Sequence, residues 1–211
     1  KRVSVITLAN DFGKSLEAGF KEKAGEYGIE ILGEYDYSIK DREFGPIVSK
    51  VKAESPDAIY ASGYFFTAGP LVTQLREAGV TAPVIGQEGY DGEMFIKIAG
   101  DAAEGVIITT SLDRDSNDPL AQAFITGFQA KSGYPADMVS ASTHTAVLVL
   151  AEALKQVDPS DKAALRQAIA STSINAATGN ISFNKLGEVK KSVQVQVVRD
   201  GGWHHYAVIS D

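Results

Sequence analysis

Alternation between strand-like and helix-like segments is the feature of this 211-residue sequence that most constrains its fold. Residues 2–8 are apolar and β-branched, as expected of a strand that is buried on both faces of a parallel sheet. Apolar residues then recur at helical spacing over 16–27, after a cap at Asn10 or Asp11. The pattern predicts a strand and then a helix, which Gly28 ends.

The same strand-helix unit repeats along the first half of the chain. After the first pair, the pattern predicts strands at 30–37, 57–62, 83–86 and 105–111, and helices at 43–54, 65–78 and 92–98. Strands that alternate with helices indicate βαβ units. The sequence therefore predicts an α/β fold built on a doubly wound parallel sheet.

The pattern changes after Leu112. Three helices follow one another without a strand between them, at 119–132, 138–156 and 161–170, and then come strands at 180–183, 192–199 and 203–209. This break predicts one domain over residues 1–111 and a partial second lobe over 112–211, made of helices and terminal β-hairpins. The few short strands of the tail indicate that it completes a sheet elsewhere.

Composition and charge exclude several classes of function. The formal net charge is −7, and the longest basic runs are pairs such as Lys190 and Lys191, so we expect no nucleic-acid partner. Without cysteine the chain has neither disulfides nor a thiolate. No apolar run approaches the roughly 20 residues of a membrane helix. Lys1 leads straight into a strand without a signal-peptide pattern, which indicates a mature, trimmed or cytosolic chain.

Three loops follow strands of the predicted sheet, where open α/β sheets bind their ligands. They comprise 10–13, 63–66 and 87–90. The candidate ligand-binding residues in these loops are Asp11, Phe12, Gly63, Tyr64 and Glu88. Aromatic walls with one carboxylate suit a small cationic or zwitterionic molecule, whose ammonium group would bond to a partly buried Glu88 beside Tyr64.

Each candidate also has a structural interpretation. Glu88 can be a solvated residue beside a glycine turn, and Tyr64 and Phe66 can be core or interface aromatics. Asp11 can serve only as a helix cap. Spacing alone leaves these alternatives open.

Enzymatic patterns are missing from the sequence. The three histidines are His144, His204 and His205, and the last two are adjacent, so that they point to opposite faces of a strand and make a poor metal pair. The sequence contains no nucleophile elbow, phosphate loop or dinucleotide glycine fingerprint. We therefore expect no enzyme activity, no cofactor and no metal.

A series of motifs, taken in order, resembles one known family. They are Phe12-Gly13, Pro56 to Tyr60 continuing to Gly63-Tyr64, Gln74 to Gly79, Ala99 to Val106, Gly179 to Asn184 with Gly187, and Val195 to Trp203. Over nearly its whole length the chain resembles the type I periplasmic solute-binding proteins of ABC importers, specifically the leucine/isoleucine/valine-binding group.

This resemblance implies a two-lobed protein that closes over a ligand by a hinge motion. Residues 1–111 would be the second, C-terminal ligand-binding lobe, and 112–211 the returning segment of the first lobe. Most of the first lobe would be missing from the sequence and supplied by a missing segment or another chain. Glu88 matches the family's ammonium-binding acidic position, Tyr64 its Gly-Tyr aromatic, and Phe12 an aromatic place where many members have tyrosine.

The resemblance also implies a function and a location. The chain would capture an amino acid, branched-chain or similar, and deliver it to an ABC importer permease. It would be periplasmic or on the cell surface, secreted with a signal that this sequence lacks. The alternative is a ligand-sensing regulator of the same fold, such as the cytosolic amide sensors. A secretory signal ahead of the first lobe would favour transport.

Overall fold

The computed structural model describes residues 1–210. The chain divides into two compact units. The first unit comprises Lys1–Thr109 together with Val197–Trp203, and the second comprises Thr110–Gln196 together with the residues from His204 onward.

The first unit contains a parallel sheet whose strands run in the order β2-β1-β3-β4-β5. The bounds of these strands are Arg2–Leu8 for β1, Glu30–Tyr37 for β2, Ala58–Ser62 for β3, Val84–Gly86 for β4 and Ile107–Thr110 for β5. The helices between them are α1 at Asp11–Glu26, α2 at Gly45–Glu54, α3 at Phe65–Glu77 and α4 at Glu93–Ala99, with 3-10 turns η1 at Glu88–Tyr90 and η2 at Gly100–Ala103.

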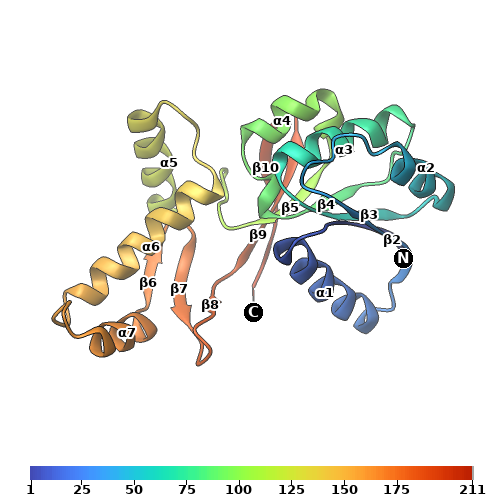
Figure 1. The fold of residues 1–211 in the computed structure, drawn as a ribbon. Helices are drawn as coiled ribbons and strands as arrows, with labels where there is room; N and C mark the ends of the chain where they lie inside the picture. Colours follow the sequence, from blue (N-terminus) through green and yellow to red (C-terminus); the bar gives the residue numbers. More distant parts are fainter. Residues whose placement is uncertain (211) are drawn as a thin grey trace. The chain divides into compact units, whose positions relative to one another are not determined.

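Helices cover both faces of this sheet (Figure 1). On one face, Phe20 of α1 packs with Val3, Val5 and Tyr60, and its ring stacks on that of Tyr60 at a centroid distance of 4.2 Å. On the other face lie α2, α3 and α4, above a much larger apolar cluster. The predicted doubly wound α/β class is therefore confirmed.

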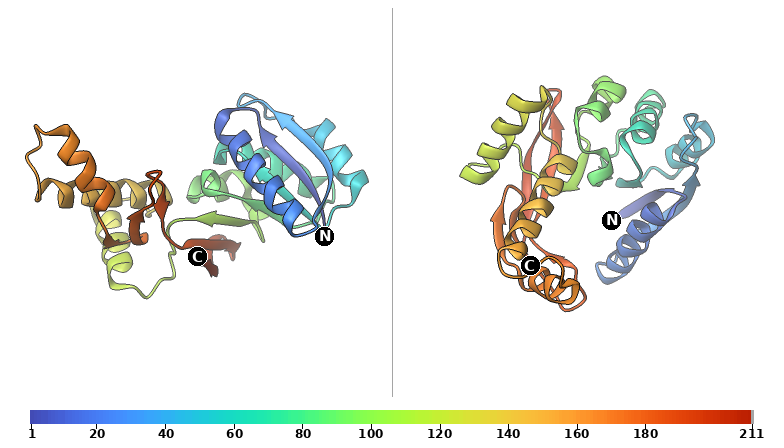
Figure 2. Two further views of the ribbon diagram at one scale, coloured as in Figure 1. Left: turned by 90° about the horizontal axis from the view of Figure 1, so that it is seen from below. Right: turned by 60° about the vertical axis from the view of Figure 1, so that its left-hand side comes forward.

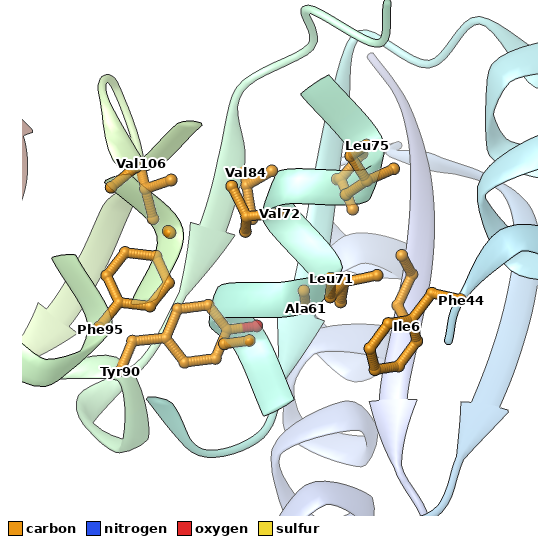
Figure 3. Packing of buried hydrophobic residues seen from close by; sticks show 14 of the residues in the cluster. Ile6, Phe44, Ala61, Leu71, Val72, Leu75, Val84, Tyr90, Phe95 and Val106 are labelled. Atoms are coloured by element: carbon orange, nitrogen blue, oxygen red, sulfur yellow. The ribbon is translucent and has the colours of Figure 1, made fainter. Parts of the chain in front are cut away.

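The large cluster draws side chains from nearly every element of the first unit. Figure 3 shows Ile6 of β1, Leu71 of α3, Val84 of β4 and Phe95 of α4 packed in one layer. Phe95 stacks on Tyr90 at 5.3 Å and on Trp203 at 5.7 Å between ring centroids. Such continuous burial makes the sheet a rigid platform for the loops at its edge.

The second unit is mostly helical. Its elements are α5 at Pro119–Ser132, α6 at Met138–Leu154, α7 at Lys162–Ser171, and an antiparallel sheet of β6 at Ile174–Ala176, β7 at Gly179–Phe183 and β8 at Val189–Lys190. Asp118, Asp137 and Asp161 accept hydrogen bonds from the first-turn N–H groups of the three helices, which explains where each helix begins. Figure 2 shows α6 and α7 beside β6 and β7.

The tail differs from the sequence-based expectation. Strands β9 at Val193–Arg199 and β10 at Gly202–Ile209 extend the large sheet beyond β5, and Val198 exchanges backbone hydrogen bonds with Gly105 and Val106. Residues 197–203 therefore belong to the first unit, whereas the sequence pattern placed all of 112–211 together. The pattern also missed β6 and β8, which are too short to show periodicity.

None of the helices within residues 1–210 combines the length and the apolar character that crossing a bilayer requires.

Candidate functional site

The carboxyl ends of β1, β3 and β4 meet at one edge of the sheet in the first unit. The three strands pair in parallel, β1 with β3 and β3 with β4, so the loops that follow them emerge on the same side. These are the loops that sequence analysis selected. Open parallel sheets bind ligands at this edge.

The first loop joins β1 to α1. Asn10 is the helix cap, since its Oδ1 accepts a hydrogen bond from the Gly13 N–H at 2.8 Å. Asp11 is the first residue of the helix and its side chain is exposed, so the cap role considered for it falls to Asn10. Gly13 has to be glycine, because a Cβ there would collide with the carbonyl oxygen of Leu8.

Aromatic side chains from two loops form a stack. The half-buried rings of Phe12 and Tyr64 lie nearly parallel, with centroids 5.2 Å apart and planes at 7°. Tyr64 in turn stacks on Phe66 at 5.7 Å. The structure thus brings together Phe12 and Tyr64, which the sequence proposed separately, and extends the pair by a third ring.

A cation borders this stack. The guanidinium carbon of Arg42 lies 5.3 Å from the centroid of Phe66, within the range of a cation–π contact. Arg42 belongs to the loop after β2, which sequence analysis left out. Treating the end of β2 like the ends of the other strands would have revealed it.

Helix α3 begins at this edge with a fixed geometry. The Thr67 hydroxyl donates to the Tyr64 carbonyl at 2.9 Å and accepts from the Tyr64 N–H at 3.3 Å. The buried Tyr37 hydroxyl donates to the carbonyl of Ser62 at 2.8 Å and fills the space where Gly63 would carry a side chain. Burial raises the pKa of Tyr37 to about 12, so this hydroxyl keeps its proton at neutral pH.

Glu88 opens the 3-10 turn η1 after β4, and its side chain is exposed. The sequence-based expectation was a partly buried carboxylate, so the structure corrects its environment. Two residues later, the fully buried ring of Tyr90 anchors the turn in the core. The buried Tyr90 ring therefore fixes η1 to the core, while the Glu88 side chain remains exposed to solvent.

Gln87 links the second and third loops. Its side chain is only 2% exposed. Its amide Nε2 donates to the Gly63 carbonyl at 3.0 Å, and its Oε1 accepts from the Gly89 N–H at 2.7 Å. The sequence pattern placed Gln87 in the loop at 87–90 and indicated no role for it. A glutamine directly after an apolar strand was the available signal in the sequence.

The three histidines all lie in the second unit. His204 Nδ1 lies 3.1 Å from Asp115 and His205 Nδ1 lies 2.8 Å from Asp113, so each imidazole has its own carboxylate partner. His144 packs against Phe124 at 5.0 Å between ring centroids. Within residues 1–210, no group of three or more potential metal ligands gathers.

The chain is similar to known proteins of one family. The model of a family described as "Periplasmic binding protein" matches residues 1–202. The chain is 27% identical over 190 residues to the leucine-, isoleucine-, valine-, threonine- and alanine-binding protein of Pseudomonas aeruginosa. The alignment covers 90% of this chain and 51% of that protein. It is 29% identical over 191 residues to Leu/Ile/Val-binding protein homolog 3 of Brucella melitensis, at the same coverage.

Solved structures of solute-binding proteins have the same fold as this chain. A leucine-binding protein from Thermotoga maritima superimposes with a TM-score of 0.93 at 29% identity, covering 100% of this chain and 61% of that one. A solute-binding protein from R. palustris in complex with benzoate gives a TM-score of 0.91 at 20% identity, a likeness that concerns the fold alone. The chain spans about half the length of the curated relatives it matches.

Proposed function

Because the chain belongs to the periplasmic binding protein family, we propose that it is the ligand-gripping part of an extracytoplasmic receptor that captures an amino acid for an ABC importer. One observation carries this proposal: the loops bearing Tyr64 and Glu88 are joined at the carboxyl edge of the sheet by the buried amide of Gln87. An aromatic wall and a carboxylate then stand on neighbouring, fixed turns. Pockets for small zwitterions need such a combination.

The charges of the site support a ligand with an ammonium group. Glu88 offers an exposed carboxylate at the start of η1, and an ammonium can donate to it by charge-assisted hydrogen bonds. The stacked rings of Phe12 and Tyr64 offer an apolar surface for the rest of the ligand. Asp11 and Gly63 complete the proposed binding loops.

The names of the relatives support the ligand class. The Pseudomonas aeruginosa protein is named for leucine, isoleucine, valine, threonine and alanine, and the Thermotoga maritima structure is that of a leucine-binding protein. Branched-chain or similar amino acids are therefore the proposed ligands. The proposed activity is binding followed by hinge closure, without a covalent step, so the chain is proposed not to be an enzyme.

The division of the chain supports a proposal about the lobes. The first unit carries the candidate site, and we assign it to the second ligand-binding lobe. The second unit exposes Val139 and Val147 of α6 at 62% and 60%, which suits a returning segment of the first lobe that further chain covers. The proposed cover is the remainder of the first lobe, since the chain matches only about half of its curated relatives.

The proposed receptor works outside the cytoplasm, at the periplasmic or outer cell surface, and hands its ligand to the permease of an ABC importer. The family description supports the location, and a similar solved structure from Rhodospirillum rubrum, described as that of a branched-chain amino acid ABC transporter, supports the partner.

Titration calorimetry on the complete protein tests the proposal. L-Leucine, L-isoleucine and L-valine should bind, and 4-methylpentanoate, which is leucine without its ammonium group, should bind at least about 100-fold more weakly, because Glu88 would then lack its partner. Equal or tighter binding of 4-methylpentanoate would show that the proposed ligand class is wrong.

A further inference from the structure

The side chain of Gln87 satisfies backbone groups of both the second and the third loop. Its backbone is extended, with φ −146° and ψ −173°, and the chain continues from it into η1. The amide nitrogen donates to Gly63 of one loop, and the amide oxygen accepts from Gly89 of the other. At 2% exposure, water does not compete for these bonds.

The two turns approach each other backbone to backbone. A Cβ on Gly89 would collide with the Gly63 carbonyl oxygen, and a Cβ on Gly63 would collide with the Tyr37 hydroxyl. Glycine at position 89 therefore permits the close approach of the two turns, and glycine at position 63 leaves room for the Tyr37 hydroxyl. The Gln87 amide bridges the same two backbones and holds them at that distance.

The bridge lies next to both candidate ligand contacts. Tyr64 directly follows Gly63, and Glu88 lies between Gln87 and Gly89. A shift of either turn would change the distance between the aromatic wall and the carboxylate. Binding sites tolerate only small changes in such distances, because their contacts require side chains that are positioned to within about 0.5 Å.

We propose that Gln87 is a positioning residue that fixes the spacing of Tyr64 and Glu88 before ligand binds, and thereby sets the affinity of the site. This inference rests on the proposed function, because it assigns these two residues to the ligand. Gln87 itself acts through the backbone of Gly63 and Gly89, with both ends of its amide already used.

The chain offers a matched control. Gln74 of α3 makes the same kind of bridge elsewhere in the first unit: its Nε2 donates to the Arg42 carbonyl at 2.7 Å, and its Oε1 accepts from the Phe44 N–H at 2.7 Å. Replacing it removes two bonds to the backbone of the loop after β2, which contributes none of the proposed ligand contacts, and leaves Gly63 and Gly89 untouched. A loss that is merely structural should appear in both variants.

The experiment compares Gln87→Leu and Gln74→Leu in the complete protein. Without ligand, hydrogen exchange at the Gly89 N–H should accelerate by about 10-fold or more in Gln87→Leu and stay at the parent rate in Gln74→Leu. Affinity for L-leucine should fall by about 10- to 100-fold in Gln87→Leu and by less than about threefold in Gln74→Leu.

A second variant keeps the test valid if Gln87→Leu fails to fold. In Gln87→Glu the new carboxyl can donate to the Gly63 carbonyl only when it is protonated, so affinity relative to the parent should recover as the pH falls to about 5. A pH-independent affinity ratio would overturn the positioning role, and so would parent-like binding by Gln87→Leu.

The outcomes separate this inference from the proposed function. If the parent binds none of the L-amino acids, the proposed function fails, and faster Gly89 exchange in Gln87→Leu would still support the bridge that fixes the two turns. If Gly89 exchange is unchanged in that variant, the positioning inference fails even when L-leucine binds to the parent.

Discussion

The two units of the chain cover their apolar residues to very different extents. In the first unit, one continuous cluster runs from Ile6 to Trp203, and its largest members, such as Tyr90, Phe44 and Phe95, are fully buried. In the second unit, the principal cluster consists of Leu112, Ala136 and Ala141 with three partly buried aromatic and aliphatic neighbours.

Helix α6 shows the difference most clearly. Residues 146–151 of this helix are all apolar, yet Val147 and Leu150 expose 60% and 42% of their surface, and Val139 near its start exposes 62%. Helix segments that are apolar all round are normally buried. Beside it, an apolar cavity of about 440 Å³ opens between α6 and the strands β7 and β8, lined by Val149, Ile181 and Phe183 among others.

The first unit therefore carries its own core, whereas the second leaves apolar residues of α6 exposed. Contact with further polypeptide, as proposed above, is one way to cover such residues. The following expectations test this difference, beginning with the largest effect.

Removing a core side chain from the first unit should cost most. Phe95→Ala should lower the free energy of unfolding by about 3 to 5 kcal/mol, because it empties the space between Tyr90 and Trp203. Trp203 is the only tryptophan and is buried in this unit, so its fluorescence during urea unfolding reports on the first unit. Val147→Ala is the control and should cost under about 0.5 kcal/mol in the 211-residue chain. Equal costs would contradict the comparison.

Ligand binding should depend on the first unit's loops. In the complete protein, Glu88→Gln should weaken amino-acid binding by about 2 to 5 kcal/mol, because the ammonium group would be desolvated without its counter-ion. Glu93→Gln, which neutralises an exposed carboxylate of α4 outside the proposed binding loops, should change the affinity little. Calorimetric titration with L-leucine measures both. Parent-like binding by Glu88→Gln would remove this residue from the site.

Alkaline pH should destabilise the first unit selectively. Burial raises the pKa of Tyr37 and Tyr60 to about 12, and also raises that of Tyr90, whereas Tyr134 and Tyr206 of the second unit are exposed. The folded state therefore holds these phenolic protons more tightly than the unfolded state, in which the pKa of tyrosine is about 10.

This contribution to stability is complete below pH 10 and is lost as the pH rises through 12. The slope should be about 1 kcal/mol per pH unit for each buried tyrosine. Urea titrations followed by Trp203 fluorescence across this window measure it. A flat profile between pH 10 and 12 would show that these hydroxyls are not buried as the structure has them.

A charge introduced on α6 should change the stability of the complete protein but not that of the 211-residue chain. Val147→Asp should be nearly neutral in the 211-residue chain but should lower the stability of the complete protein by about 1 to 3 kcal/mol, because further polypeptide would bury the carboxylate. Leu186→Asp, at a position 84% exposed in a turn, should be neutral in both. Thermal unfolding of both substitutions in both proteins measures these changes in stability. If Val147→Asp were neutral in the complete protein, further polypeptide would not cover α6 at this residue.

The smallest effect should come from a single hydroxyl. Tyr64→Phe keeps the stack with Phe12 and removes at most one hydrogen bond to the ligand, so affinity for L-leucine should fall by about 1 kcal/mol and stability should not change. Calorimetry and thermal unfolding separate the two quantities. A large loss of stability would show that the hydroxyl serves the fold of the first unit instead.

The sequence by itself determined the first unit's architecture and the edge at which to look for a site. Strand and helix periods are local properties, so β1 at 2–8, α5 at 119–132 and the strand ends before Asp11, Gly63 and Glu88 could be read from residues close in the chain. The family resemblance was equally local, because its motifs are short and occur in order.

Tertiary structure alone decided how those local pieces meet. That Gln87 bridges Gly63 and Gly89, that Arg42 lies over Phe66, and that residues 197–203 return to the first unit's sheet all depend on contacts between segments far apart in the sequence. No periodicity encodes such pairings, because a hydrogen bond or a ring contact is set by the three-dimensional packing that brings the two partners together.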